Sequence, residues 1–154
     1  MKDLNRKLMI QQLDKKLEKL SILEEVLVPS DGWIKTIRTT LNMNLAQFAK
    51  KLKKSSPTVS ELEEREANRN ITLKKLMEVG EVLDLKLVYG FVPKDGSLEK
   101  MIEKRAYKIA KDIVTRTSHS MKLEDQENTE ARLKEAIDDR AKQIKYEMPK
   151  YLWD

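Results

Sequence analysis

The sequence contains no cysteine among its 154 residues, which excludes disulfide bonds, thiolate metal sites and cysteine nucleophiles. His119 is the only histidine, so a histidine-based metal site or acid–base cluster is not expected. No apolar run approaches the ~18 residues of a membrane span, and residues 1–20 alternate charges with leucine, unlike a signal peptide. We therefore expect a cytoplasmic protein that is not an enzyme and uses neither a metal nor a cofactor.

Turn-forming and aromatic residues are also few. Glycine and proline number four each, and aromatic residues make up 5% of the chain, a composition that favours helices joined by few turns. A chain of this length has room for one domain with appendages or for two small domains. The sequence predicts three parts: an N-terminal amphipathic helix within residues 1–28, a DNA-binding region over 31–93, and a helical C-terminal region over 97–154.

The periodicity of apolar residues predicts most of the helices. Leucines at spacings of three, four and seven predict an amphipathic helix over residues 4–27. A break follows at residues 29–32, where Ser30 or Asp31 would cap the next helix. Two further helices are expected to begin near Trp33 and Leu45, and a third is capped by Ser55 or Ser56. Another is capped by Thr72.

One segment has the pattern of a strand. Residues 85–92, LKLVYGFV, are rich in residues that favour strands and end at Pro93. A single strand leaves its backbone groups without partners, so we expect it to pair with the same strand of a second subunit in a homodimer. A long helix is expected after the cap Ser97, with an interruption over 115–120, and a last helix over 132–144. Trp153 in the tail would either anchor a partner or fold back on its own core.

The distribution of charge favours a nucleic-acid partner. No acidic residue occurs between Asp31 and Glu61, whereas that interval carries six positive charges. A compact helical unit with one basic surface suits duplex DNA, because neutralising phosphates supplies most of the affinity. The alternative is that Ser55, Ser56 and Thr58 only cap a helix and the lysines only keep a face soluble. The basic residues of the interval are Lys35, Arg38, Lys50, Lys51, Lys53 and Lys54.

Residues 33–84 resemble the helix-turn-helix of the Xre/Cro/phage-repressor family. The resemblance rests on Gln47 and Ala49 in LAQFAKKL and on the pattern S-x-P-x-V-S-x-L-E over residues 55–63. It implies an all-α, five-helix core, here with one short strand, whose helix from Ser56 enters the major groove of operator DNA. Lys53 stands where this family usually has glycine. The residues that the resemblance places against DNA fall into two groups. Gln47 and Ser55 would hold phosphate at helix N-termini, and Ser56, Thr58 and Ser60, with Glu61 behind them, would face the bases. The charge pattern, rather than the resemblance, adds Lys50, Lys53 and Lys54 to the phosphate contacts.

The chain as a whole resembles the family called mobile mystery protein A. The matching segments are DGWIKTIR (31–38), ITLKKL (71–76), LDLKLVYGFVPKDGSLEKMIEKRA (83–106), MKLEDQ (121–126) and the terminal Leu152-Trp153. The resemblance implies a bacterial protein whose partner, mobile mystery protein B, carries a Fic domain. Fic enzymes typically transfer AMP from ATP to a protein hydroxyl. The chain would then be the antitoxin and autorepressor of a toxin–antitoxin pair.

Inhibitors of Fic enzymes share a short helical motif, Ser/Thr-x-x-x-Glu followed by Gly or Asn, and the resemblance places it at Ser120 and Glu124. The glutamate would pair with an arginine that otherwise holds the ATP γ-phosphate. Asp125 stands in the position of Gly or Asn. The same four-residue spacing also occurs at Ser21/Glu25 and at Ser60/Glu64. Two alternatives stay open: the Ser120/Glu124 pair is only a solvated helical pair, or the protein is a plain repressor whose C-terminal helices dimerise or sense a ligand.

Overall fold

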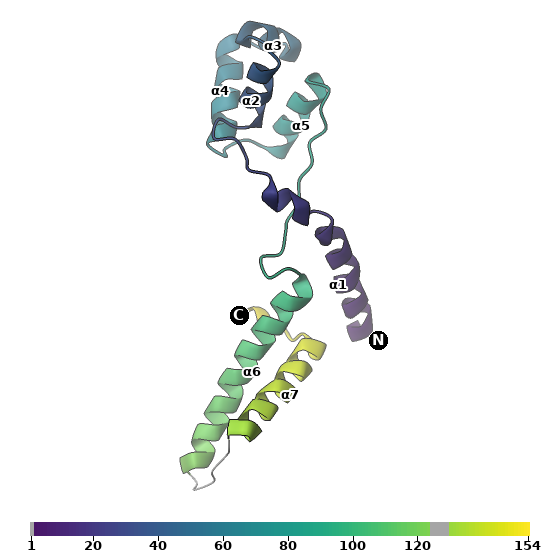
Figure 1. The fold of residues 1–154 in the computed structure, drawn as a ribbon, viewed down its shortest axis with the longest axis vertical. Coiled ribbons are helices and arrows are strands. Elements are labelled where there is room, and N and C mark those ends of the chain that lie inside the picture. The colour runs from purple at the N-terminus through teal and green to yellow at the C-terminus, as the bar shows by residue number, and fades with distance from the viewer. Residues whose placement is uncertain (1, 124–129) are drawn as a thin grey trace. The chain divides into compact units, whose positions relative to one another are not determined.

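The computed structural model describes residues 2–123 and 130–154 (Figure 1). These residues form helices and contain no strand, so the prediction of a mainly helical chain is confirmed. None of the helices in the described ranges is long and apolar enough to cross a membrane. In chain order the elements are α1 (Lys2–Glu18), the 3-10 helix η1 (Ser21–Glu25), α2 (Trp33–Thr40), α3 (Leu45–Leu52), α4 (Ser56–Ala67), α5 (Leu73–Val82), α6 (Leu98–Leu123), α7 (Glu130–Glu147) and the 3-10 helix η2 (Lys150–Trp153).

The chain divides into two compact units. Unit 2 is the continuous stretch 24–89, whereas unit 1 combines residues 1–23 with residues 90–154. The sequence suggested a separate N-terminal helix, but α1 belongs to the same unit as the C-terminal helices α6 and α7. Unit 1 is therefore discontinuous in sequence, and unit 2 is an insertion within it.

Unit 2 is a bundle of α2, α3, α4 and α5 around an apolar core (Figure 1). Phe48 of α3 and Val59 of α4 are fully buried, and α3 makes its most extensive contact with α4. Truncating a buried phenylalanine costs about 3–5 kcal/mol, so this contact fixes the two helices firmly. Each of the four helices contributes to the buried cluster, whose other members are Ile34, Ala49, Leu62 and Val79.

Helix α2 begins differently from the prediction that Ser30 or Asp31 caps it. Its N-cap is Gly32, whose φ of 83° lies in the left-handed region that suits glycine. The backbone N–H groups of the first two residues of α2 donate to the carboxylate of Glu66, at 2.9 and 2.8 Å. A side chain from α4 thus replaces a local cap, because its carboxylate accepts from free N–H groups and its charge is favourable at a helix N-terminus.

Unit 1 is built on a hairpin of α6 and α7, which lie side by side (Figure 1). Two small residues of α6, Ala106 and Ala110, are fully buried and allow α7 to approach closely. Helix α6 is continuous to Leu123, so the predicted interruption over 115–120 is wrong. The polar residues there are compatible with a helix, as Thr117 shows by donating to the carbonyl of Ile113 at 3.0 Å. The core also contains Ile102, Ile137, Ile144 and Leu152.

Helix α1 docks on unit 1 through few contacts. The carboxylate of Asp14 accepts from the backbone N–H groups of Leu98 at 2.7 Å and Glu99 at 3.2 Å, so α1 caps the start of α6. Ser97 also caps α6, as predicted, by accepting from the N–H of Lys100. No described residue of α1 is fully buried. The predicted helix over residues 4–27 is too long, because α1 ends at Glu18 and the shorter η1 follows.

The C-terminal tail folds back on its own unit. Leu152 of η2 is fully buried in the core of unit 1, and its carbonyl accepts from Arg105 Nε at 2.7 Å. The same guanidinium lies 5.5 Å from the ring centroid of Trp153, within the range of a cation–π contact. Of the two alternatives for Trp153, the structure thus contains the fold-back, with the indole about half exposed.

Residues 85–92 do not form the predicted strand. The chain leaves α5 with a hydrogen bond from the N–H of Leu85 to the carbonyl of Gly80 at 2.7 Å, and then runs without helix or strand to Pro93. Within the described ranges no other segment lies beside it in a ladder of backbone hydrogen bonds. The physical reason is simple: a strand needs a neighbour, and the described part of this chain supplies none.

Candidate nucleic-acid interface

The first helix of the predicted helix-turn-helix, α3, begins with a capping box. The side chain of Asn44 accepts from the N–H of Gln47 at 2.8 Å, and Gln47 Oε1 accepts from the N–H of Asn44 at 2.9 Å. This reciprocal pair satisfies two N–H groups at the helix start. Gln47, predicted to hold phosphate, is exposed in the first turn with its oxygen engaged and its NH2 group turned to no described partner. An amide donor at this position can reach an anion at the helix N-terminus.

The turn between α3 and α4 is closed by Lys53. This residue has φ 55° and ψ 43°, the left-handed conformation that glycine adopts most easily. The N–H of Lys54 donates to the carbonyl of Ala49 at 3.0 Å, and the N–H of Lys53 donates to that of Lys50 at 3.2 Å. These two bonds form a Schellman motif, which ends α3 sharply. The turn therefore takes the backbone form that a glycine would favour, although a lysine occupies it.

The second helix, α4, begins as the sequence predicts. Ser55 is its N-cap and accepts from the N–H of Thr58 at 3.3 Å, while the two side-chain hydroxyls lie 2.7 Å apart. Pro57 stands in the first turn, where its missing N–H leaves no unsatisfied donor. Thr58 and Ser60 are exposed and Ser56 is half-buried. The start of α4 thus presents hydroxyl groups to solvent.

The predicted base-facing residues lie on two flanks of α4. Thr58 and Glu61 line a hollow between α4 and the start of α5, whereas Ser60 lines a different hollow with Lys35 of α2. The 3.6-residue period of the helix separates the two sets. Glu61 is engaged in an exposed ion pair with Arg65, one turn further along, at 2.7 Å. The structure therefore brings Thr58 and Glu61 together and sets Ser60 apart from them.

The hollow between α4 and α5 has a volume of about 600 Å³ and is lined mostly by positive and hydroxyl side chains. Three basic residues in it were missed from the sequence, because the acidic run after Ser60 led us to end the basic surface there. Two of them follow Glu61 by about one and two helical turns, and the third lies in the first turn of α5. This spacing is the signal in the sequence that would have indicated a shared face. They are Arg65, Arg69 and Lys75, and they join the predicted Lys54.

Two of these cations have acidic partners, since Arg65 pairs with Glu61 and Lys75 pairs with Glu78. Lys75 Nζ lies 2.9 Å from Glu78 Oε2, and its hydrogen bond and charge lower the pKa of Glu78. By contrast, Lys50, Lys53 and Lys54 are exposed and form no ion pair within the described part of the chain. These three lysines surround the turn, with their side chains exposed to solvent.

Arg38 does not belong to that surface. Its Nε donates to both carboxylate oxygens of Glu63, at 2.8 and 3.1 Å, and its Nη1 donates to the carbonyl of Met43 at 2.9 Å. The Glu63 side chain is buried, at 5% exposure, and the Arg38 side chain is largely shielded, at 11%. Of the six positive charges in the acid-free interval, that of Arg38 is therefore matched by a carboxylate within unit 2.

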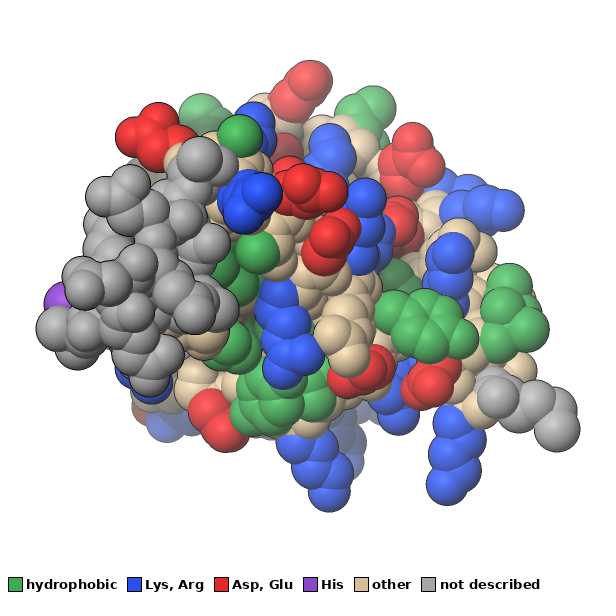
Figure 2. All heavy atoms as spheres, turned by 90° about the horizontal axis from the view of Figure 1, so that it is seen from below, with side chains coloured by type: hydrophobic (Ala, Val, Ile, Leu, Met, Phe, Trp, Pro, Cys, Tyr) green, Lys and Arg blue, Asp and Glu red, His purple; other side chains and the backbone are tan. Residues whose placement is uncertain are grey.

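Of the predicted partner-inhibitory motif, only the first four residues lie in the part of the chain that the structure describes. Ser120 falls within α6, and Glu124 lies outside the described residues. His119, just before the motif, is exposed. On the face shown in Figure 2, positive and negative side chains are interspersed with apolar ones, and neither sign forms a continuous patch.

Comparisons with known proteins add no relative: no family model, no curated protein and no solved structure matches this chain.

Proposed function

We propose that unit 2 binds duplex DNA as a transcriptional repressor, with α4 in the major groove. The observation that supports this best is the capped start of α4, whose exposed hydroxyls are flanked by three unpaired lysines, Lys50, Lys53 and Lys54. Lysines at the turn suit phosphates on either side of a groove, and hydroxyls at a helix start suit base edges within it. Gln47 at the start of α3 adds an amide donor for phosphate.

We further propose that the protein is the antitoxin of a Fic-type pair and represses its own operon. This part is supported by the sequence resemblance, which implies a Fic-domain partner. Glu124 would reach the partner's nucleotide site, where its carboxylate would pair with an arginine and occupy the position of the γ-phosphate. Ser120, one helical turn earlier, would enter the same cleft. The other candidate is a plain repressor that senses a ligand, for which unit 1 offers a hollow of about 220 Å³ lined by Ile10, Ile102 and Tyr146.

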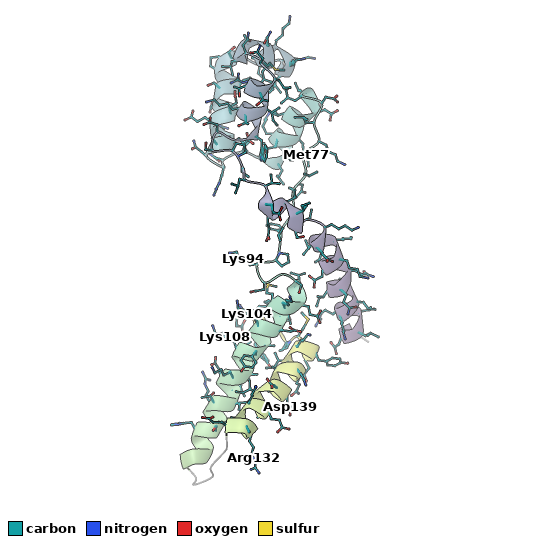
Figure 3. The ribbon with its side chains drawn as sticks, viewed as in Figure 1. Met77, Lys94, Lys104, Lys108, Arg132 and Asp139 are labelled. Carbon is teal, nitrogen blue, oxygen red and sulfur yellow. The ribbon has the colours of Figure 1, made fainter. Side chains whose placement is uncertain are left out.

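The DNA-binding proposal is tested by the salt dependence of operator binding. Replacing Lys50, Lys53 and Lys54 by alanine should weaken binding and reduce the slope of log K against log salt by about one unit for each lost contact. A control with the same loss of charge replaces the exposed Lys104, Lys108 and Lys111 of α6, where the first two point away from α7 (Figure 3). If the slope is unchanged in the first variant, or falls equally in both variants, the lysines at the turn do not contact phosphate.

The antitoxin proposal is tested by co-expression with the Fic-domain partner. Glu124→Ala should release the partner's AMP transfer, measured by labelling of its target protein with ATP that carries the radioactive label on its α-phosphate, because the other two phosphates leave as pyrophosphate. Glu25→Ala is the matched control, because Ser21 and Glu25 have the same spacing and Glu25 is exposed in η1. If the partner's AMP transfer stays inhibited in the presence of Glu124→Ala while the two proteins still associate, the inhibitory role of Glu124 is wrong. The plain repressor would then be the better-supported function.

A further inference from the structure

Unit 1 has a hollow between α1 and the hairpin of α6 and α7. Its volume of about 220 Å³ lies below the ~300–1,000 Å³ of sites for drug-sized molecules, so it suits a smaller ligand. Helix α1 packs on α6 and makes little backbone contact with α7, and residues of both α1 and α7 line the hollow. Because all three helices contribute to the lining, the hollow is complete only while α1 is docked.

The floor of the hollow is apolar and consists of Ile10, Ile102 and Met148. Ile102 of α6 is buried, and Ile10 of α1 and Met148 after α7 pack half-buried against the same core. Ile10 and Met148 also line a second hollow, of about 410 Å³, on another flank of α1. The core of unit 1 is therefore incompletely covered beside α1. A ligand with an apolar body would complete the cover, since burying apolar surface stabilises a complex by ~25 cal/mol for each Å² removed from water.

The rim of the hollow has an excess of positive charge. Lys145 is paired with Glu99 at 3.0 Å, so these two charges offset each other. Lys7 and Lys142 form no ion pair within residues 2–123 and 130–154. The remaining acid in the lining is Asp3. Two lysines therefore stand against one aspartate at the opening.

We propose that this hollow binds a small carboxylate with an apolar chain. The chain would lie on the apolar floor, and the carboxylate would meet Lys7 and Lys142, with the phenol of Tyr146 as a further hydrogen-bond donor. The inference goes beyond DNA binding, because it names the class of ligand for the ligand-sensing alternative. It requires neither an operator nor a Fic-domain partner.

The signs of the rim charges favour an anion over other ligands with the same apolar body. A cation would meet two ammonium groups and one carboxylate, and like charges repel. An apolar amino acid would place its own ammonium group beside the same two lysines. A neutral ligand would gain only the apolar contact, whereas hydrogen bonds between ionised groups are the stronger kind.

Binding should also stabilise the docking of α1, since the ligand would contact α1 and the hairpin together. The converse follows by linkage: a change that loosens α1 reduces the fraction of protein with a complete site and weakens binding. Asp14 holds α1 to the start of α6 and lies outside the lining of the hollow. We therefore expect Asp14→Ala to raise the Kd for the ligand although it removes no ligand contact.

The test uses the full chain without DNA or partner and four ligands that share a six-carbon chain: hexanoate, its neutral isostere hexanamide, hexylammonium and the zwitterion norleucine. Nuclear magnetic resonance shifts of the isoleucine and methionine methyl groups give a Kd for each. Hexanoate should bind about tenfold tighter than hexanamide, a difference of ~1.4 kcal/mol. No saturable binding of hexanoate, equal affinities for hexanoate and hexanamide, or tighter binding of either of the other two ligands would overturn the proposal.

Variants then locate the site. Lys7→Gln and Lys142→Gln should each reduce the preference for hexanoate over hexanamide, whereas Lys108→Gln, an equal loss of charge on the side of α6 away from α7 (Figure 3), should leave it unchanged. Ile10→Phe should fill the hollow and weaken the binding of both ligands. Circular dichroism should show that each variant keeps its helical content.

Two results with the variants would overturn the proposal: a preference that neither lysine variant changes, or an affinity that Ile10→Phe leaves unchanged. Hydrogen exchange gives an independent check, because hexanoate should slow the exchange of the α1 amides in the unmodified protein and should do so less in Asp14→Ala. Exchange in α1 that is unaffected by saturating hexanoate would also contradict this site. If hexanoate binds and operator binding fails, the DNA-binding proposal is wrong and this site stands.

Discussion

At the scale of single residues, Lys53 and Arg38 show how lysine and arginine in one basic segment can have different roles. Lys53 occupies a left-handed backbone position at the turn, with its charge in solvent. Arg38 is largely shielded from solvent and pairs with Glu63 within unit 2. The sequence pattern treats the two charges alike, because it contains no information about which of them meets a distant carboxylate.

The strain at Lys53 leads to a first prediction. A non-glycine residue at a left-handed position costs roughly 1–2 kcal/mol, partly offset by the entropy that glycine loses on folding. We expect Lys53→Gly to stabilise unit 2 by about 0.5–1 kcal/mol in urea unfolding. Lys51→Gly removes the same charge inside α3 and should destabilise it by about 1 kcal/mol. Equal effects of the two variants would show that the backbone of Lys53 is unstrained.

The buried ion pair leads to a second prediction. Glu63→Ala leaves the Arg38 guanidinium largely shielded without its carboxylate, and we expect a loss of about 3–5 kcal/mol in the free energy of unfolding. The exposed pair of Glu61 and Arg65 serves as the comparison, since Glu61→Ala should cost less than about 1 kcal/mol. Chemical denaturation monitored by helical circular dichroism measures both. A small cost for Glu63→Ala would mean that water reaches Arg38.

At the scale of elements, two helices obtain their N-terminal caps from elsewhere in the chain. Glu66 of α4 caps α2 from 32 and 33 residues away. Asp14 of α1 caps α6 from 84 and 85 residues away. In each case one carboxylate accepts from the free N–H groups at a helix start and also holds that helix against another one.

The Asp14 contact leads to a third prediction. Asp14→Ala removes the two carboxylate oxygens that accept from the N–H groups of Leu98 and Glu99, and we expect a loss of about 1–2 kcal/mol from unit 1. Because few other contacts hold α1, its amides should also exchange with solvent much faster, as measured by hydrogen exchange with mass spectrometry. Asp112→Ala, at an exposed position of α6, is the control and should change stability by less than about 0.5 kcal/mol. Unchanged exchange in α1 would show that apolar contacts alone hold it.

The contact between α7 and α6 leads to a fourth prediction. Burial lowers the pKa of Lys145, but hydrogen bonds to Glu103 at 2.6 Å and Glu99 at 3.0 Å outweigh it, and the pKa lies above the usual 10.5. A pKa raised by folding means that the ammonium stabilises unit 1 below pH 10.5 and that this contribution is lost as the pH rises through the folded-state value. Lys145→Gln should cost less than about 1 kcal/mol at neutral pH and should flatten the loss of stability above pH 10.5. Lys111→Gln should leave the shape of the pH profile unchanged.

At the scale of the whole molecule, the features predicted correctly from the sequence are those that depend on residues close together in the chain. Ser55, Thr72 and Ser97 cap helices as expected, because a cap depends on residues within one turn. The predictions that were wrong concern features that depend on residues far apart in the sequence. The cap of α2 comes from Glu66, the charge of Arg38 is matched by Glu63, and residues 85–92 lack the neighbour that a strand needs. Of the candidate site, the turn and the start of α4 were predictable, whereas the cations across the α4–α5 hollow required the fold.

The two separate cores lead to a fifth prediction. Phe48 and Ile144 belong to buried clusters that share no residue. Phe48→Ala should cost about 3–5 kcal/mol and Ile144→Ala about 2–5 kcal/mol. We expect hydrogen exchange to accelerate in α3 and α4 for the first variant and in α6 and α7 for the second, each with little change in the other unit. A uniform acceleration across both units would show that they unfold together.

The interruption of unit 1 by unit 2 also sets the order in which the chain can fold as the ribosome makes it. Residues 24–89 emerge as one uninterrupted piece, so the bundle of α2 to α5 can close before α6 exists. Helix α1 is synthesised first, but its Asp14 must wait for Leu98 to leave the exit tunnel before it finds the N–H groups it caps. We therefore expect the nascent protein to form the bundle of α2 to α5 before the hairpin of α6 and α7, so that a chain stalled after residue 97 would contain the bundle without the hairpin.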